Sequence, residues 1–318
     1  MKMTINEYRD LVHEHTKAFK PAEAIKAIKV WLEEYARANN MERAVLGISG
    51  GKDSTIVAKL LVDVLGKDNV FGLLMPNGEQ KDISDSLKVV ELLDIGYTTI
   101  NIAKVHNTLM EVMGGHSNLT LDAKINIPPR IRMMTLYAWG QSNGYRVAGT
   151  GNLSERTLGY FTKWGDGASD FNIIGNFTSL EVMRIGEELG LPLDLVYKTP
   201  DDGLSGMSDE EKLGITYIDM HTYLRKDKSK LSDETLHKIM VKENLSNHKR
   251  NQIPLVDYRY CQVELPDVGK ELVITLKGGE KCRAFLTITS AYIEGFVFET
   301  VDYHTIRLSE VIEWEYAE

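Results

Sequence analysis

The chain is poor in cysteine. Only Cys261 and Cys282 occur among its 318 residues, and neither belongs to a C-x-x-C arrangement. Structural zinc sites and disulfide frameworks need several cysteines at characteristic spacings. The sequence therefore predicts neither a zinc site nor a disulfide framework.

Long apolar runs are also missing. No stretch approaches the roughly 18 consecutive apolar residues of a membrane-spanning helix. Residues 1–8 are charged and lack the apolar segment of a secretory signal. We therefore expect a cytoplasmic protein that makes no contact with a membrane.

Positive charge is in deficit. The chain has 37 Lys and Arg against 46 Asp and Glu, a formal net charge of −9. Proteins that bind tRNA or DNA usually present a basic face, so the excess of acidic residues argues against a nucleic-acid partner. The chain is 43% hydrophobic and 26% charged, which suits a folded protein with one main domain and a smaller one.

The most informative stretch is SGGKDS at residues 49–54. It follows an apolar run at residues 44–48 and precedes apolar residues at helical spacing over 55–62. Glycines let a backbone approach an oxyanion, and the start of a helix favours negative charge. A Walker A loop needs Ser or Thr where Asp53 follows Lys52, and the glycines do not fall as G-x-G-x-x-G. The stretch predicts a phosphate-binding turn of another kind.

Strand-like and helix-like segments alternate along most of the chain. This alternation predicts an α/β fold with a doubly wound parallel sheet, whose ligands bind at the carboxyl ends of the strands. The expected strands are residues 44–48, 70–75, 97–102 and 145–150, and the expected helices are 21–39, 55–62, 84–93 and 130–140.

The pattern changes from about residue 255. Short strand-like runs at 272–276, 285–288, 295–298 and 305–308 follow one another, with a turn signal at 277–280. We expect a main domain at residues 1–254 and a small β-rich appendix at 255–318, of the size of an SH3-like barrel. The role of this appendix is not evident from its residues.

The SGGKDS stretch resembles the SGGxDS loop of the PP-loop ATP pyrophosphatases, whose fold is adenine nucleotide alpha-hydrolase-like. The stretches GTGNLSERTLGYFTKWGDGASD at 149–170 and LSNHKR at 245–250 narrow the resemblance to ammonia-dependent NAD synthetase, over residues 20–255. The resemblance implies an ATP-dependent amidation of nicotinic acid adenine dinucleotide. Its carboxylate attacks the α-phosphate of ATP, and ammonia then displaces AMP.

The resemblance also assigns roles to residues. It implies that Asp53 and Glu155 are the catalytic carboxylates and hold Mg²⁺, a cation that favours few carboxylates and several waters. The implied ATP contacts are Ser49, Gly50, Gly51, Ser54, Gln80 and Thr150. The implied contacts with the dinucleotide are Arg130, Phe161, Lys163, Asp166, Asp170, His248 and Lys249.

Each of these residues also has a purely structural interpretation. Asp53 could be an N-cap that opens a helix, and Glu155 could be a solvated carboxylate at a helix start. The polar ATP-contact residues could belong to ordinary turns. The charged substrate-contact residues could form surface ion pairs, and Phe161 could be a core residue.

Three positions depart from the pattern of the family. Leu74 stands where an arginine is frequent, Ser179 where a lysine follows a threonine, and Asp201 where a threonine follows a proline. The lysine and threonine approach the ATP phosphates in the family. Their loss implies either that Lys198 or another cation compensates, or that turnover is slow.

The resemblance further implies free ammonia as nitrogen donor and a homodimer whose interface builds the dinucleotide site. Glutamine-using relatives carry an N-terminal amidase domain with a catalytic cysteine, whereas about 44 residues without cysteine precede the first expected strand here. Two alternatives stay open. One is another adenylating PP-loop enzyme such as a tRNA-modifying ligase, and the other is a dinucleotide-binding module without turnover.

Overall fold

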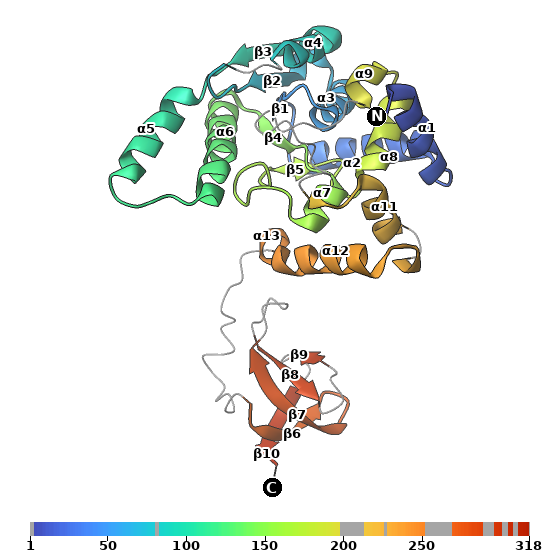
Figure 1. Cartoon of the computed structure of the whole chain (residues 1–318), viewed down its shortest axis with the longest axis vertical. Helices are drawn as coiled ribbons and strands as arrows, with labels where there is room; N and C mark the ends of the chain where they lie inside the picture. Colours follow the sequence, from blue (N-terminus) through green and yellow to red (C-terminus); the bar gives the residue numbers. More distant parts are fainter. Residues whose placement is uncertain are drawn as a thin grey trace. The chain divides into compact units, whose positions relative to one another are not determined.

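The structure is a computed structural model that describes residues 3–79, 83–197, 213–225, 228–251, 269–288, 296–300, 305–307 and 311–317. The chain divides into two compact units, Met1–Asn244 and Leu245–Glu318. Each unit has a sheet of its own (Figure 1).

A five-stranded parallel sheet forms the centre of the first unit. Every pairing is parallel, with Val45 level with Phe71 on one side and Val147 on the other. The chain adds strands outward from the central strand in one direction and then returns to continue in the other. The expected doubly wound α/β sheet is confirmed. Its strands, in spatial order, are β3 (Gly96–Thr99), β2 (Val70–Leu74), β1 (Ala44–Gly47), β4 (Arg146–Gly149) and β5 (Phe171–Asn172).

Helices cover both faces of this sheet (Figure 1). Successive side chains of a strand point to opposite faces. Accordingly Val45 packs in one hydrophobic cluster with α6 (Leu121–Asn143), while Leu46 packs in the other with α2 (Pro21–Ala38), α3 (Lys52–Leu65) and α8 (Ser179–Glu188). Both side chains are fully buried, so β1 lies at the centre of the core.

The remaining helices belong to the first unit, except for the last of them in the sequence. None of the described helices is long and apolar enough to cross a membrane. They are α1 (Ile5–His15), α4 (Ile83–Leu93), α5 (Ala103–Gly114), α7 (Leu153–Leu158), α9 (Leu193–Val196), α11 (Tyr217–Arg225), α12 (Asp233–Leu245) and α13 (Asn247–Arg250), with 3₁₀ turns η1 (Lys67–Asn69) and η2 (Lys228–Lys230).

Helix α6 is longer than the sequence indicates. The sequence predicts a helix over residues 130–140, whereas α6 begins at Leu121. Pro128 and Pro129 both lie inside α6, although proline removes a helical hydrogen bond. Burial of Ile131 and Leu136 against the sheet outweighs the missing bonds.

Each of the four strands expected in this sheet is one or two residues shorter in the structure. The strand expected over residues 97–102 is β3, Gly96–Thr99, and the strand expected over 145–150 is β4. Strand β5 was not expected, since two residues are too few to show an alternating pattern. It extends the sheet beyond β4.

The second unit carries a five-stranded antiparallel sheet, which confirms its β-rich character. Its core contains Leu272, Ile274, Leu286 and Phe298, all almost fully buried. The boundary expected between residues 254 and 255 lies outside the described residues and stays a prediction. The strands, in spatial order, are β10 (Val311–Tyr316), β6 (Glu271–Leu276), β7 (Lys281–Ile288), β8 (Phe296–Thr300) and β9 (Thr305–Arg307), of which β10 was not expected.

Because each unit has its own core, we expect two unfolding transitions in calorimetry. Ile274→Ala should lower the midpoint of the transition of the second unit only, since deleting a fully buried isoleucine costs about 2–5 kcal/mol. Val273→Ala, a control on the same strand with a partly exposed side chain, should have a smaller effect. A single transition that Ile274→Ala shifts as a whole would show that the units unfold together.

Candidate active site

The order of strands places a crevice beside β1. Strand order reverses between β1 and β4, and the segments leaving these two strands part in opposite directions. In open parallel sheets ligands bind at such a reversal, outside the carboxyl ends of the strands. The loop Ile48–Gly51 leaves β1 there, and residues 150–152 leave β4.

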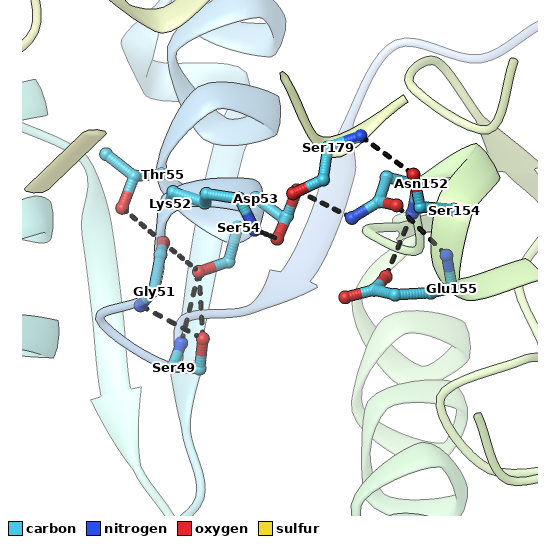
Figure 2. A network of polar contacts seen from close by, with 10 residues as sticks. All are labelled: Ser49, Gly51, Lys52, Asp53, Ser54, Thr55, Asn152, Ser154, Glu155 and Ser179. Carbon is cyan, nitrogen blue, oxygen red and sulfur yellow. Dashed lines mark hydrogen bonds and ion pairs between the residues drawn. The ribbon is translucent and has the colours of Figure 1, made fainter. Parts of the chain in front are cut away.

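The loop after β1 is held by its own hydrogen bonds (Figure 2). Ser54 Oγ donates to the Gly51 carbonyl at 3.1 Å and contacts Ser49 Oγ at 3.1 Å, while Gly51 N donates to Ser49 Oγ at 3.2 Å. Thr55 Oγ1 also donates to the Gly51 carbonyl, at 2.8 Å. The loop therefore has its shape before any ligand binds.

Gly50 is required by both its backbone and its surroundings. Its φ is +76°, and a Cβ there would lie 2.8 Å from Asp85 Cβ and from Ser86 N at the start of α4. A side chain at this position would displace either the loop or α4. The tight contact explains one of the two glycines of the SGG stretch.

Asn152 joins the two loops. Its amide Nδ2 donates to Asp53 Oδ1 at 3.3 Å, and its Oδ1 accepts from Glu155 N at 3.1 Å. Its backbone N donates to Glu155 Oε2 at 3.0 Å, which completes a capping box at the start of α7. One fully buried asparagine thus orients both predicted metal ligands (Figure 2).

A pocket of about 250 Å³ opens between these loops. The structure brings together seven of the residues expected to contact ATP, metal or substrate, and it adds Gly151 and Tyr160, which the sequence did not single out. The lining residues are Ser49, Gly51, Asp53, Ser54, Thr150, Gly151, Glu155, Tyr160 and Asp166.

Negative charge dominates the pocket. Burial raises the pKa of Glu155 to about 8, and the neighbouring carboxylate of Asp53 adds to this rise. The only cation that the described residues pair with Asp53 is Lys52, whose Nζ lies 2.7 Å from Asp53 Oδ2. Burial by itself would lower the pKa of Lys52, but Asp53 and Glu155 together raise it.

The donor set of the pocket fits Mg²⁺. Asp53 and Glu155 offer carboxylate oxygens, the ligands that hard divalent cations prefer, and both line a polar pocket with room for further ligands. No group of three or more His, Cys, Asp or Glu suited to a metal occurs among the described residues. Two carboxylates with water and phosphate oxygens is the arrangement that Mg²⁺ commonly adopts.

The loop between α7 and β5 carries several of the expected substrate contacts. Arg130 of α6 donates through Nε to the Lys163 carbonyl at 3.2 Å, and Asp166 Oδ1 accepts from Thr162 N at 3.0 Å. A Cβ at Gly167 would lie 2.3 Å from the ring of Phe161, so this glycine lets the ring pack closely on the loop. Of these residues Asp166 lines the pocket, whereas Arg130, Phe161 and Lys163 do not, and their contacts with a dinucleotide stay predictions.

Asp170 is occupied elsewhere. Its Oδ2 accepts from Val147 N at 2.8 Å, which ties the start of β5 to β4. Tyr137 also approaches it, and burial together with this carboxylate raises the pKa of Tyr137 to about 12. Asp170 does not line the pocket, and its contact with a dinucleotide stays a prediction.

Three further expected residues are not placed against the pocket. Gln80 lies outside the described residues, as does the segment with Lys198 and Asp201. His248 and Lys249 belong to α13 in the second unit. Their roles stay predictions.

The departures at positions 74 and 179 introduce no charge. Leu74 is fully buried at the end of β2. Ser179 is fully buried at the first position of α8, where its N donates to Ser154 Oγ at 3.1 Å and its own Oγ has no partner. Among the described residues, the cation beside the carboxylate pair is Lys52 rather than a group on β2 or α8.

The raised pKa of Glu155 predicts a pH dependence of stability. Without metal, the folded protein keeps this proton to a higher pH than the unfolded chain does. The resulting stabilisation is present below about pH 4.5, the ordinary Glu value, and is lost as the pH rises toward about 8. Glu155→Gln should flatten this fall in denaturant unfolding in EDTA, whereas the exposed control Glu91→Gln should not. An equally steep fall in Glu155→Gln would assign the dependence to other groups.

A profile of the NAD synthase family matches residues 24–258. An NH(3)-dependent NAD(+) synthetase of Pyrococcus furiosus is 40% identical over 234 residues, which cover 71% of this chain and 85% of that protein. A protein of the same name from Archaeoglobus fulgidus is 38% identical over 221 residues, covering 68% and 88%.

Solved structures show the same likeness. An NMN synthetase of Francisella tularensis superposes with a TM-score of 0.69 at 33% identity, covering 75% of this chain and 99% of that one. An NH3-dependent NAD synthetase of Campylobacter jejuni gives 0.63 at 27% identity, covering 75% and 100%. With its glycine loop, its paired carboxylates and a family match over most of its length, the chain belongs to the NAD synthase family.

Proposed function

We propose that this protein amidates nicotinic acid adenine dinucleotide with free ammonia, at the expense of ATP, to give NAD, AMP and pyrophosphate. One observation carries the proposal. A preformed glycine loop and two carboxylates from separate loops line a single pocket at the reversal point of the sheet. Family membership supports the same reaction and disfavours a tRNA-modifying ligase or a module without turnover.

The loop and α3 bind the phosphates of ATP. The positive end of the helix dipole and the backbone of the loop favour an anion at this point, and Ser49 and Ser54 place hydroxyl groups in the pocket. The loop's internal hydrogen bonds mean that little order has to be created on binding. Thr150 supplies a further polar group from the opposite side.

Asp53 and Glu155 hold the metal ion that the reaction needs. Mg²⁺ bound there would neutralise the triphosphate, so that an anionic carboxylate can approach the α-phosphorus and pyrophosphate can leave. Asn152 keeps both side chains in position, because its backbone N donates to Glu155 Oε2 and its Nδ2 donates to Asp53 Oδ1. The carboxylate oxygen of the substrate forms a bond to the α-phosphorus as the bond to pyrophosphate breaks.

Ammonia completes the reaction. Its nitrogen attacks the carbonyl carbon of the acyl adenylate, AMP leaves with the oxygen that linked it to the acyl group, and a proton is released. We propose that Arg130, Phe161, Lys163 and Asp166 position the dinucleotide for this step. Phe161, Lys163 and Asp166 share one loop, which supports the proposal, because Arg130 of α6 binds the Lys163 backbone and Asp166 lines the pocket.

We further propose a homodimer in the cytoplasm. Helix α6 buries Ile131 and Leu136 against the sheet, while Met134 and Tyr137 on its other side are 59% and 36% exposed. Exposed apolar surface on the side of a helix that faces away from the sheet suits an interface between identical copies. Arg130 precedes Met134 by one helical turn, so a dinucleotide site at such an interface would include it.

The synthetase domain is proposed to be residues 1–254, and residues 255–318 an accessory module. The match to the family ends at residue 258, which supports this division. The described residues of the second sheet contain no group of His, Cys, Asp or Glu suited to a metal. We assign no catalytic group to this module.

A second substrate is favoured by one observation. The NMN synthetase structure superposes better than the NAD synthetase of Campylobacter jejuni, with a TM-score of 0.69 against 0.63. Nicotinic acid mononucleotide carries the same nicotinate carboxylate, so the chemistry at Asp53 and Glu155 would be unchanged. The two substrates differ only in the adenylate part of the dinucleotide.

An assay with purified protein, ATP, MgCl₂ and ammonium separates these possibilities. Offered both acids in parallel, the protein should convert the dinucleotide to NAD with a higher kcat/KM than the mononucleotide, and it should release AMP and pyrophosphate. Glutamine in place of ammonium should give little product. A higher kcat/KM for the mononucleotide would make that acid the substrate instead of the dinucleotide. Formation of ADP and phosphate would overturn the proposed reaction.

Asp53→Asn and Glu155→Gln should each lower the rate of pyrophosphate release roughly a hundredfold or more. Each removes one charge from a metal site built of two carboxylates and leaves the size of the side chain unchanged. Asp68→Asn, an exposed residue of η1, is the control. Full activity in either variant, with circular dichroism like that of the unsubstituted protein, would reduce that carboxylate to a structural role.

A further inference from the structure

Lys52 is an unusual residue for its place in the fold. It is the first residue of α3, where the helix dipole disfavours a positive charge, and its side chain is only 4% exposed. Burial of an ammonium group is costly unless an anion accompanies it. Neither the helix nor the core therefore explains a lysine at this position.

The neighbours of Lys52 supply that explanation. Its Nζ donates to Asp53 Oδ2 at 2.7 Å and lies 5.3 Å from the ring centre of Tyr217 in α11. Asp53 Oδ1 accepts from Asn152, so each of the two oxygens of this carboxylate has a different donor. Lys52 does not line the pocket and would not touch a phosphate directly.

The positive charge of Lys52 should affect the binding of Mg²⁺ and the binding of ATP in opposite directions. A fixed positive charge behind Asp53 repels Mg²⁺ and attracts the phosphates of ATP. It also offsets the repulsion between Asp53 and Glu155 when no metal is bound.

We propose that Lys52 is a positioning residue whose ammonium group holds Asp53 in place when no metal is bound. Its charge also favours the binding of Mg²⁺ together with ATP over the binding of free Mg²⁺. The proposal rests on the proposed function only in taking Asp53 and Glu155 as the metal ligands. Lys52 acts through Asp53 and through its charge. It takes no part in bond making.

The test compares Lys52→Met with Lys59→Met by isothermal titration calorimetry, with MgCl₂ alone and with ATP in EDTA as separate probes. Lys59 is a matched control, because it lies on the same helix and pairs with Asp63 away from the pocket. Lys52→Met should bind free Mg²⁺ roughly tenfold more tightly, the effect of one charge about 6 Å from a divalent ion in a water-like medium. It should bind ATP more weakly, and Lys59→Met should change neither affinity.

Loss of both affinities by a similar factor would mean that Lys52 has a structural role only, and weaker Mg²⁺ binding in Lys52→Met would overturn the proposal. Should Lys52→Met fail to fold, Lys52→Gln keeps a donor to Asp53 while removing the charge, and the same opposite changes are expected. These titrations do not depend on which acid is amidated. If the NAD assay fails but the two affinities change in opposite directions, this inference stands and only the proposed function is overturned. If neither the unsubstituted protein nor Lys52→Met binds Mg²⁺, both are overturned.

Discussion

Repulsion between two carboxylates governs the structure around the pocket. Asp53 and Glu155 come from segments that follow different strands, and burial together with the charge of Asp53 raises the pKa of Glu155. The fold tolerates the pair because Asn152 donates to both side chains and Lys52 supplies one positive charge. Burial and the charge of Asp53 nevertheless raise the pKa of Glu155 to about 8. A divalent cation bound between the two carboxylates would favour the ionised form of Glu155 and offset their repulsion.

The sheet explains how Asp53 and Asn152, 99 positions apart in sequence, can meet at this site. Strands β1 and β4 are neighbours because the winding direction reverses between them, so their loops open on the same crevice. Each loop is then fixed locally. Gly50 fits closely under α4, Ser54 binds the carbonyl of Gly51, and Asn152 caps α7. A ligand that enters the pocket would therefore spend little of its binding energy on ordering these loops.

Much of this arrangement could be predicted from sequence, since the signals are local. The SGGKDS stretch indicates a turn before a helix, and alternation of strands and helices indicates the parallel sheet. Asn152 was missed although N-x-x-E is a capping signal, because its link to Asp53 depends on the tertiary fold. Burial of Lys52 depends on α11 and could not be read from α3 alone. The sequence did not predict the first part of α6, which contains two prolines, because its helical conformation depends on packing against residues distant in sequence.

The most direct test of the metal site is a crystal of this protein grown with MnCl₂ and a non-hydrolysable ATP analogue, measured at the manganese absorption edge. We expect an anomalous peak about 2.0–2.3 Å from a carboxylate oxygen of Asp53 and of Glu155, with phosphate oxygens completing the coordination. A peak bound by only one of these residues, or located elsewhere while the nucleotide occupies the pocket, would contradict it.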